Sequence, residues 1–348
     1  RIARDRPNRS GFGALFINRQ STGDLVVPGV AEYNRTYAVD GRKGFGRYSQ
    51  VTGFLAGTST PGITSDAWAY DGAFLRESPR FDTRAKFTNV GSGFNPEVGF
   101  LRRRAFRKID LHVLNRTRPK DFIGIQELRP HISYRGYFKP DGFYESGFTH
   151  IDNHWEFKSQ WEIDTGVNLT HEGLRAPFTI APGVTVPVGS YDNAEAQIVG
   201  ISPVSKPVSI NLHTVIGGYY SGHRVAIAPT VKFRAGEQLS GTLTINYNRV
   251  SLPEGTFEAN LFRLRASYSF SPRVFVQSLV QYNQQTSYLS GNFRFGWLQS
   301  ANAGLFIVYN EGRERDTLNE GLRDDSSFGQ VRDRSLVIKF SRLIDVFK

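Results

Sequence analysis

The chain has 348 residues, of which 39% are hydrophobic and 22% charged, and it contains no cysteine. It can therefore form no disulfide, thiolate metal site or cysteine nucleophile, and no stretch reaches the ~18 uncharged apolar residues of a membrane-spanning helix. Its 43 Lys and Arg against 32 Asp and Glu give a net charge of +11, which favours polyanionic partners. The 27 Phe, 15 Tyr and 35 Gly are typical of strands and turns.

Short and long links alternate along the chain between segments of alternating hydrophobicity. The short links lie near 42–46, 78–80, 118–121, 151–153, 204–206, 235–238, 271–272 and 300–302. The long links include 21–30, 57–65, 91–103, 174–190 and 311–333, with shorter ones near Pro140, Ser221, Pro253 and Thr286. Short periplasmic turns and longer outer loops distinguish the two ends of an outer-membrane barrel. The pattern predicts about 18 up-and-down strands, from 9–20 to 335–347.

The middle of the chain contains the longest uninterrupted alternation. Apolar side chains from Trp155 to Leu169 face away from Glu156, Glu162 and Asp164, which predicts one strand of roughly 15 residues. Strands in globular sandwiches are mostly about 5–6 residues long, whereas a tilted strand that crosses a bilayer is longer. Strand length therefore favours a membrane barrel.

The polar faces of the predicted strands carry many charges. We expect these to line the interior of the barrel, with a basic wall in the C-terminal half and an acidic wall in the middle; the candidates are Lys232, Arg234, Arg263, Arg265, Arg294, Lys339, Glu156, Glu162 and Asp164. A basic wall would favour the passage of anions. The alternative is that these charges pair across the interior and fill it.

The densest basic cluster comprises Arg102, Arg103, Arg104, Arg107 and Lys108, at the end of a long link. An outer loop of this charge could bind the phosphates of lipopolysaccharide, or its charges could be solvated or paired. One basic run without a recognised binding module argues against nucleic acid.

Two further groups could hold a metal ion. His150 and His154 flank Asp152 at a predicted turn, where a solvated turn is the preferred interpretation over a metal site. The acidic stretch Asp316, Glu320, Asp324 and Asp325 offers oxygen ligands but lacks the spacing of a calcium loop. No nucleophile elbow, phosphate-binding loop or zinc-protease motif is present, so we predict no catalytic residue, cofactor or metal.

Five segments resemble one family, the large outer-membrane barrels of unknown function from Bacteroidota and related phyla that usually follow an N-terminal carbohydrate-binding family-9-like domain. They are Ser10–Phe16 with Asn18 and Arg19, Asn34–Tyr37 with Val39–Gly41, Phe94–Arg103, Leu305–Arg313 and Arg334–Phe340. The resemblance implies a barrel, a Gram-negative outer membrane and a soluble domain that precedes the barrel. It assigns no reaction, and saccharide binding belongs to that preceding domain.

The sequence thus predicts a single domain over residues 1–348, an all-β transmembrane up-and-down antiparallel β-barrel of the bacterial outer membrane. We expect it to pass solutes as a porin does, or to anchor a periplasmic domain and its partners. Its expected partners are outer-membrane lipid, lipopolysaccharide and other outer-membrane or periplasmic proteins. Two alternatives remain: a hydrolase that acts on lipid or polysaccharide at the barrel rim, and a soluble all-β binding protein whose aromatic stripe is a buried core.

Overall fold

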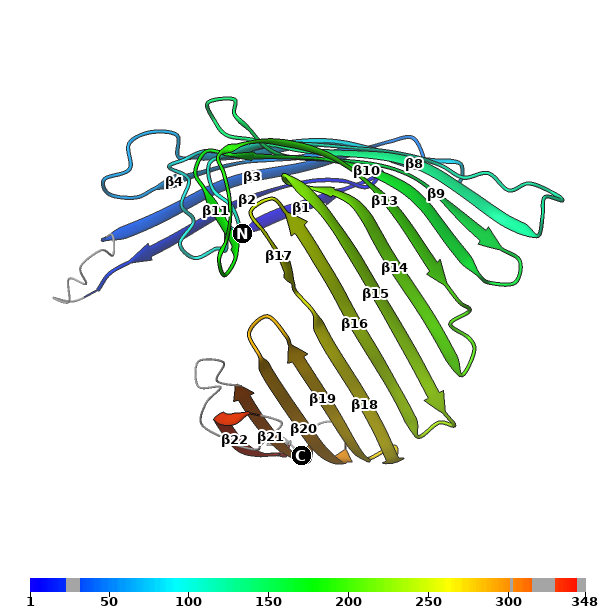
Figure 1. Cartoon of the computed structure of the whole chain (residues 1–348). Helices are drawn as coiled ribbons and strands as arrows, with labels where there is room; N and C mark the ends of the chain where they lie inside the picture. Colours follow the sequence, from blue (N-terminus) through cyan, green and yellow to red (C-terminus); the bar gives the residue numbers. More distant parts are fainter. Residues whose placement is uncertain (23–31, 301–302, 315–328, 343–348) are drawn as a thin grey trace. The chain divides into compact units, whose positions relative to one another are not determined.

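The fold is all-β, as predicted. The computed structural model describes residues 1–22, 32–300, 303–314 and 329–342, and these form 22 strands and no helix (Figure 1). Among these residues no helix is long and apolar enough to cross a membrane. Twenty strands belong to one sheet, and β11 and β12 form a separate two-stranded sheet.

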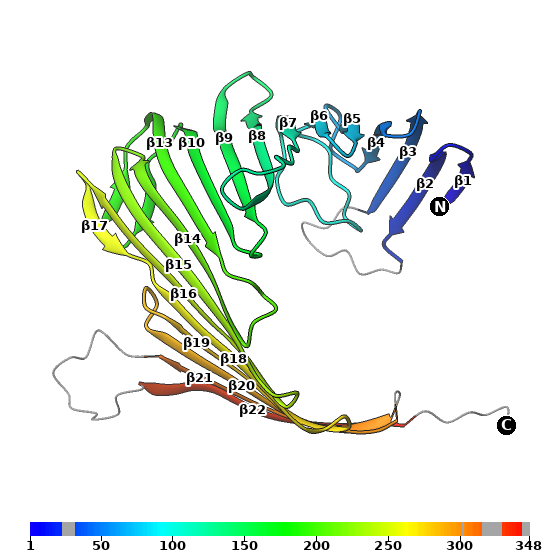
Figure 2. The same cartoon turned by 90° about the vertical axis from the view of Figure 1, so that its right-hand side faces the viewer.

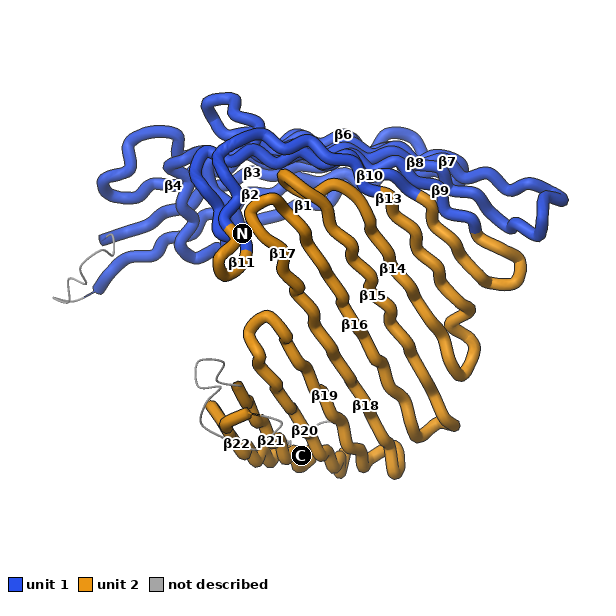
Figure 3. Tube along the Cα trace, in the orientation of Figure 1, with its two compact units in different colours: residues 1–155, 166–180, 185–195 blue, residues 156–165, 181–184, 196–348 orange. Residues whose placement is uncertain are grey.

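The chain divides into two compact units, which are residues 1–155, 166–180 and 185–195, and residues 156–165, 181–184 and 196–348 (Figure 3). The first unit contains β1 (Ile2–Arg6), β2 (Ser10–Gln20), β3 (Tyr33–Phe45), β4 (Ser49–Ser59), β5 (Trp68–Glu77), β6 (Phe81–Val90), β7 (Phe106–Asn115), β8 (Ile125–Phe138), β11 (Phe178–Ala181) and β12 (Val184–Val186), in part or whole. Both units share β9 (Tyr144–Phe157), β10 (Glu162–Leu174) and β13 (Gly189–Ile201), and β11 and β12 each have one residue in the second unit.

The second unit contains the strands of the C-terminal half. They are β14 (Val208–Tyr219), β15 (Gly222–Ala235), β16 (Leu239–Leu252), β17 (Gly255–Glu258), β18 (Leu261–Ser271), β19 (Val274–Asn283), β20 (Tyr288–Ser300), β21 (Ala303–Glu314) and β22 (Gln330–Ser341). Consecutive strands pair antiparallel, as β14, β15 and β16 do in Figure 2. The up-and-down order is therefore confirmed within this unit.

Eighteen of the 22 strands match the 18 predicted in number and order, with one turn displaced, and four short strands are additional. These four are β1, β11, β12 and β17. β17 and β18 both pair with β16, so they are one strand interrupted at Ala259 and Asn260. The buried Asn260 side chain bridges the break, because it accepts a bond from the Asn248 amide at 2.9 Å and donates to Gln284 at 2.8 Å.

One predicted turn is wrong. Residues 151–153 lie inside β9, and the chain reverses at residues 158–160, so the single strand predicted over 155–169 is two strands. The Phe157 amide donates to the Trp161 carbonyl, and Gln160 has a φ of +67°, as in a three-residue hairpin loop whose last residue is left-handed. Since Phe157 and Trp161 are four residues apart, the alternation continues unchanged through the turn and conceals it.

The register sorts side chains into an apolar face and a polar face in each unit, because cross-strand partners share a face. In the first unit Val39, Leu55 and Tyr70 are successive partners and are 54%, 45% and 41% exposed. In the second unit Ile210, Val231, Leu243, Leu264 and Val280 form such a row. The apolar faces predicted from the alternation are confirmed, and their side chains are exposed or partly exposed.

No pairing of β1 with β22 is present in the described part of the chain, so closure of the sheet into a barrel stays a prediction, as does the single-domain organisation. Some predicted segments lie outside the described residues. They are the C-terminal end of the last predicted strand, 343–347, and the links at 23–30, 301–302 and 315–328.

Close packing of Gly44 in β3 against the turn between β1 and β2 can be tested by substitution. A Cβ added to Gly44 would lie 2.1 Å from the Asn8 carbonyl oxygen, whereas a Cβ at Gly72 would meet nothing within 4 Å. We expect Gly44→Ala to lower the free energy of unfolding by about 1–3 kcal/mol, as overpacking does. Gly72→Ala, the control, should leave it unchanged or slightly raise it. Urea titration followed by tryptophan fluorescence measures both, and equal stability of the two variants would contradict the packing.

Candidate functional site on the polar face

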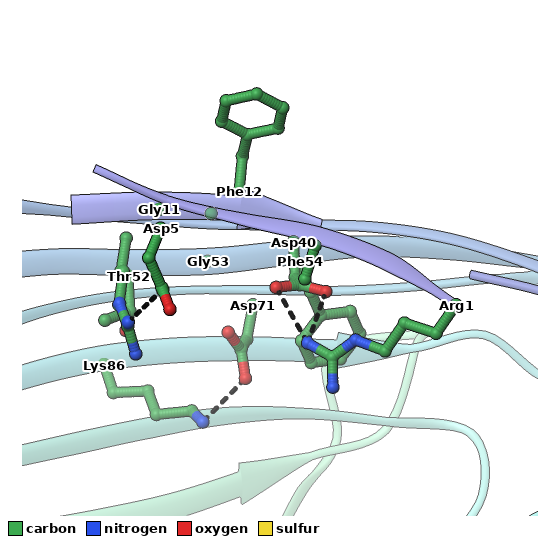
Figure 4. Close-up of a pocket in the computed structure, with 13 residues that line it drawn as sticks. Arg1, Asp5, Gly11, Phe12, Asp40, Thr52, Gly53, Phe54, Asp71 and Lys86 are labelled. Atoms are coloured by element: carbon green, nitrogen blue, oxygen red, sulfur yellow. Dashed lines mark hydrogen bonds and ion pairs between the residues drawn. The ribbon is translucent and has the colours of Figure 1, made fainter. Parts of the chain in front are cut away.

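In the first unit the polar face of β1 to β6 carries charges in matched pairs (Figure 4). The guanidinium of Arg1 lies 3.2 Å from Asp40, that of Arg42 lies 2.6 Å from Asp5, and the Lys86 ammonium lies 2.6 Å from Asp71. Phe12 points to the opposite side of the sheet from these groups. These residues line a shallow hollow. The Arg1–Asp40 and Arg42–Asp5 pairs are largely exposed, so they make the surface polar without adding much stability, whereas the Asp71 side chain of the third pair is mostly buried.

The link between β6 and β7 folds back onto this polar face. Phe94 is buried against Ala56, Ala69 and Val90. Ala56 of β4 pairs with Ala69 of β5. Ala69 is two residues from Asp71 in the same strand, so both alanines lie on the face that carries Asp71. Small alanine side chains leave room for the Phe94 ring, so the link covers the polar side of the sheet instead of projecting away from it.

Hydrogen bonds hold the folded-back link to β3 and β4. The Asn34 side chain, only 1% exposed, donates at 2.7 Å both to the Asn95 carbonyl and to the Thr60 hydroxyl. Its Oδ1 accepts a bond from the Glu97 amide, and Glu97 also pairs with Arg19. Three of the segments that carry the family resemblance, which include Arg19, Asn34 and Phe94–Arg103, are therefore in contact.

The basic cluster predicted at the end of this link does not form one patch. Arg104 donates to Asn95 Oδ1 at 2.7 Å, Arg103 pairs with Glu145 at 3.3 Å, and Lys108 pairs with Asp110 at 2.8 Å. Arg102 and Arg107 are exposed, and Arg107 pairs across β7 and β8 with Phe138, on the apolar face. Binding of lipid phosphates by these residues stays a prediction. Arg107 is the member of the cluster that lies at a strand end on the apolar face, where a lipid headgroup would be.

In the second unit the six predicted basic residues share one face. Lys232, Thr242 and Arg265 are successive cross-strand partners. The register of the neighbouring strands places the other four on the same face: Arg234, Arg263, Arg294 and Lys339. Among the described residues no carboxylate lies within salt-bridge distance of any of the six. Their charge is therefore not balanced by described acidic neighbours, in contrast to the paired charges of the first unit.

These basic residues have neutral neighbours. Arg234 donates to the Val204 carbonyl, and Arg294 lies over the ring of Phe306 at 4.6 Å. Lys232, Arg234 and Arg265 line one hollow with Ser209 and Thr242. The predicted acidic residues Glu156, Glu162 and Asp164 lie at the adjoining ends of β9 and β10, and each has interaction partners of its own.

The histidines predicted at a turn lie instead within β9, because that strand runs through Asp152 to Phe157. The structure adds His131 from β8, whose ring centroid is 5.0 Å from that of His150 and 5.1 Å from that of His154. Sequence reasoning missed His131 since 19 residues separate it from His150. The other predicted cation site, at Asp316 to Asp325, lies outside the described residues.

A hydrolytic triad is incomplete in the described part of the chain. His112 Nδ1 lies 3.0 Å from the Ser133 hydroxyl, which is the contact that a serine nucleophile and its base would make. No described carboxylate hydrogen-bonds to His112, so the group that would orient the base is missing from these residues.

Comparison with known proteins adds no assignment: no protein-family model and no curated protein matches the chain.

The anchoring of the β6–β7 link can be tested at Asn34. Asn34→Ala would leave the Asn95 carbonyl and the Thr60 hydroxyl without this donor, at a cost of about 1–3 kcal/mol. We expect trypsin to cleave after Arg102 to Arg104 about tenfold faster in this variant. Asn18→Ala, which removes only an exposed bond with Arg35, is the control. Equal cleavage rates in the two variants would show that the link is not held by Asn34.

Proposed function

We propose that the chain forms a β-barrel in the bacterial outer membrane and passes solutes, with a preference for anions. The observation that carries the proposal is that, in each unit, large apolar side chains are exposed on one face of the sheet while most of the charges lie on the other. Water inside and lipid outside is the environment that such a two-faced sheet requires.

A soluble protein would have to cover the apolar face. Phe16 and Phe270 are each 59% exposed, and Leu212 and Leu264 are each 41% exposed. Burying each side chain of this kind would stabilise a soluble fold by about 1.5–3 kcal/mol. A soluble protein with a whole sheet face of exposed apolar side chains would therefore lack a large part of its stabilisation. In the described residues the only second sheet is β11 with β12, of four and three residues, which is too small to cover such a face. This argues against the soluble sandwich.

The preference for anions rests on the unbalanced basic residues of the second unit. Unpaired cations on a polar face raise the local concentration of anions, whereas the matched pairs of the first unit contribute little net field. An anchoring role for a periplasmic domain, which the family resemblance implies, is the alternative. The folded-back β6–β7 link favours it, because a segment on the polar side reduces the open cross-section.

Membrane insertion can be tested with two neighbouring residues of β14. Leu212 is on the apolar face, and Asn211 is on the polar face opposite Thr230. We expect Leu212→Arg to lower the free energy of unfolding from lipid vesicles by about 2–4 kcal/mol, since an arginine in the hydrocarbon region is poorly solvated. Asn211→Arg, the matched control, should be nearly neutral. Urea titration of heat-modifiable migration on gels gives both values.

If Leu212→Arg and Asn211→Arg fold equally well, or if the wild-type chain stays soluble and monomeric without detergent, the membrane proposal is wrong.

Selectivity can be measured in planar bilayers with a salt gradient. Arg263 and Arg265 lie on the polar face, and Arg273 lies in the turn between β18 and β19. We expect the reversal potential of the wild-type chain to indicate a preference for anions. The double variant Arg263→Gln, Arg265→Gln should move the reversal potential toward zero, because the field of two cations is lost. Arg273→Gln should have less effect. A conducting pore with cation preference would contradict the proposed selectivity, and a chain that inserts without conducting would favour the anchor.

A further inference from the structure

We propose that the polar face of the first unit holds a divalent transition-metal ion of the Zn²⁺ class, bound by His131, Asp152 and His154. One ligand atom from each of these residues lies within 4.8 Å of the other two. His131 comes from β8 and the other two from β9, so the ion would join neighbouring strands.

The hydrogen bonding of His131 prepares its ring for a metal. Its Nδ1 lies 3.2 Å from the Arg129 carbonyl oxygen, which can only accept a hydrogen bond. The proton of the neutral ring is therefore on Nδ1, and the lone pair is on Nε2. Most metal-binding histidines are held in this way by a second-shell carbonyl or carboxylate, which fixes both the tautomer and the ring orientation.

Asp152 is a buried carboxylate that lacks a full set of partners. Its side chain is 1% exposed, and its Oδ1 has no hydrogen-bond partner among the described residues. Its Oδ2 lies 3.2 Å from His150 Nε2 and 3.9 Å from His154 Nε2. A buried carboxylate is costly unless a cation or hydrogen-bond donors compensate its charge. A metal ion would supply that compensation directly.

His150 lies beside the three proposed ligands and supports Asp152 without being a ligand itself, because it is not in the group whose ligand atoms all lie within 4.8 Å of one another. The Nδ1 atom of His150 lies 2.6 Å from Asn168 Oδ1, which can only accept a hydrogen bond, so Nδ1 is the donor. In the neutral ring, Nε2 therefore carries a lone pair, and this lone pair faces Asp152 Oδ2. The two atoms need a proton or a metal ion beside them. The 3.2 Å contact between His150 and Asp152 Oδ2 orients the carboxylate that we propose as a ligand.

The donor set selects the class of metal. Imidazole nitrogens with one carboxylate suit Zn²⁺, Co²⁺ and Ni²⁺, whereas Ca²⁺ and Mg²⁺ take oxygen ligands. All the ligands come from strands, which hold them more rigidly than a loop would. The inference does not depend on solute passage, because an ion at this position would pin β8 to β9 in either a pore or an anchor.

The test uses the full chain without an affinity tag, folded in detergent and dialysed against a chelator. Co²⁺ is titrated in and its visible absorption is followed, with Zn²⁺ added afterwards to displace it. We expect one Co²⁺ per chain with the intense absorption of a four-coordinate ion, displaced by Zn²⁺ but not by excess Mg²⁺. His131→Ala and the isosteric Asp152→Asn should weaken binding by about 100-fold or more, and Asn168→Ala by about 10-fold.

Two histidine variants control for the loss of an imidazole. His112→Ala removes the ring 5.7 Å from His131 that is not a proposed ligand, and His213→Ala removes one from β14 in the second unit. Both should bind Co²⁺ as the wild type does, and heat-modifiable migration checks that every variant is folded. The proposal is overturned if the folded wild type shows no saturable Co²⁺ or Zn²⁺ binding, or if folded Asp152→Asn binds as tightly as the wild type.

Discussion

Antiparallel hydrogen bonding is the constraint on which the rest of this structure depends. Each cross-strand pair shares a face, so the two-residue period of one strand is transmitted to the next and from there along the sheet. A shift of register by one residue would exchange the exposed apolar row of Val39, Leu55 and Tyr70 with the row of Asp40, Phe54 and Asp71. The separation of charges from apolar side chains is thus a property of the register, and the polar site exists because of it.

The same property explains what could be predicted from the sequence. Eighteen long strands, their order and the shared face of Arg263 and Arg265 follow from alternation, which is a local signal. The turn at residues 158–160 was misplaced because a three-residue loop preserves the alternation. The short strands β1, β11, β12 and β17 are too brief to show a period of two, and the break at Asn260 is held by side-chain bonds that alternation does not encode.

The candidate site was less predictable because it depends on contacts between distant segments. Asn34 and Asn95 are 61 residues apart, and no local pattern indicates that one side chain holds the other's backbone. His131 joins His150 and His154 through strand pairing, so the sequence showed only the part of the cluster within β9. Alternation was sufficient to predict which polar side chains share a face, whereas contacts that need a particular neighbour were missed.

The folded-back link between β6 and β7 also has a consequence for the order of folding. Its anchors Arg19, Asn34 and Thr58 belong to three strands that precede it, and the alanines under Phe94 come from β4 and β5. These partners come together only after β2 to β5 have paired in register, because each anchor lies on a different strand. Closing such a long connection costs entropy that local hairpins do not pay. We therefore expect docking of this link to be a late step, one that requires a correctly registered N-terminal sheet.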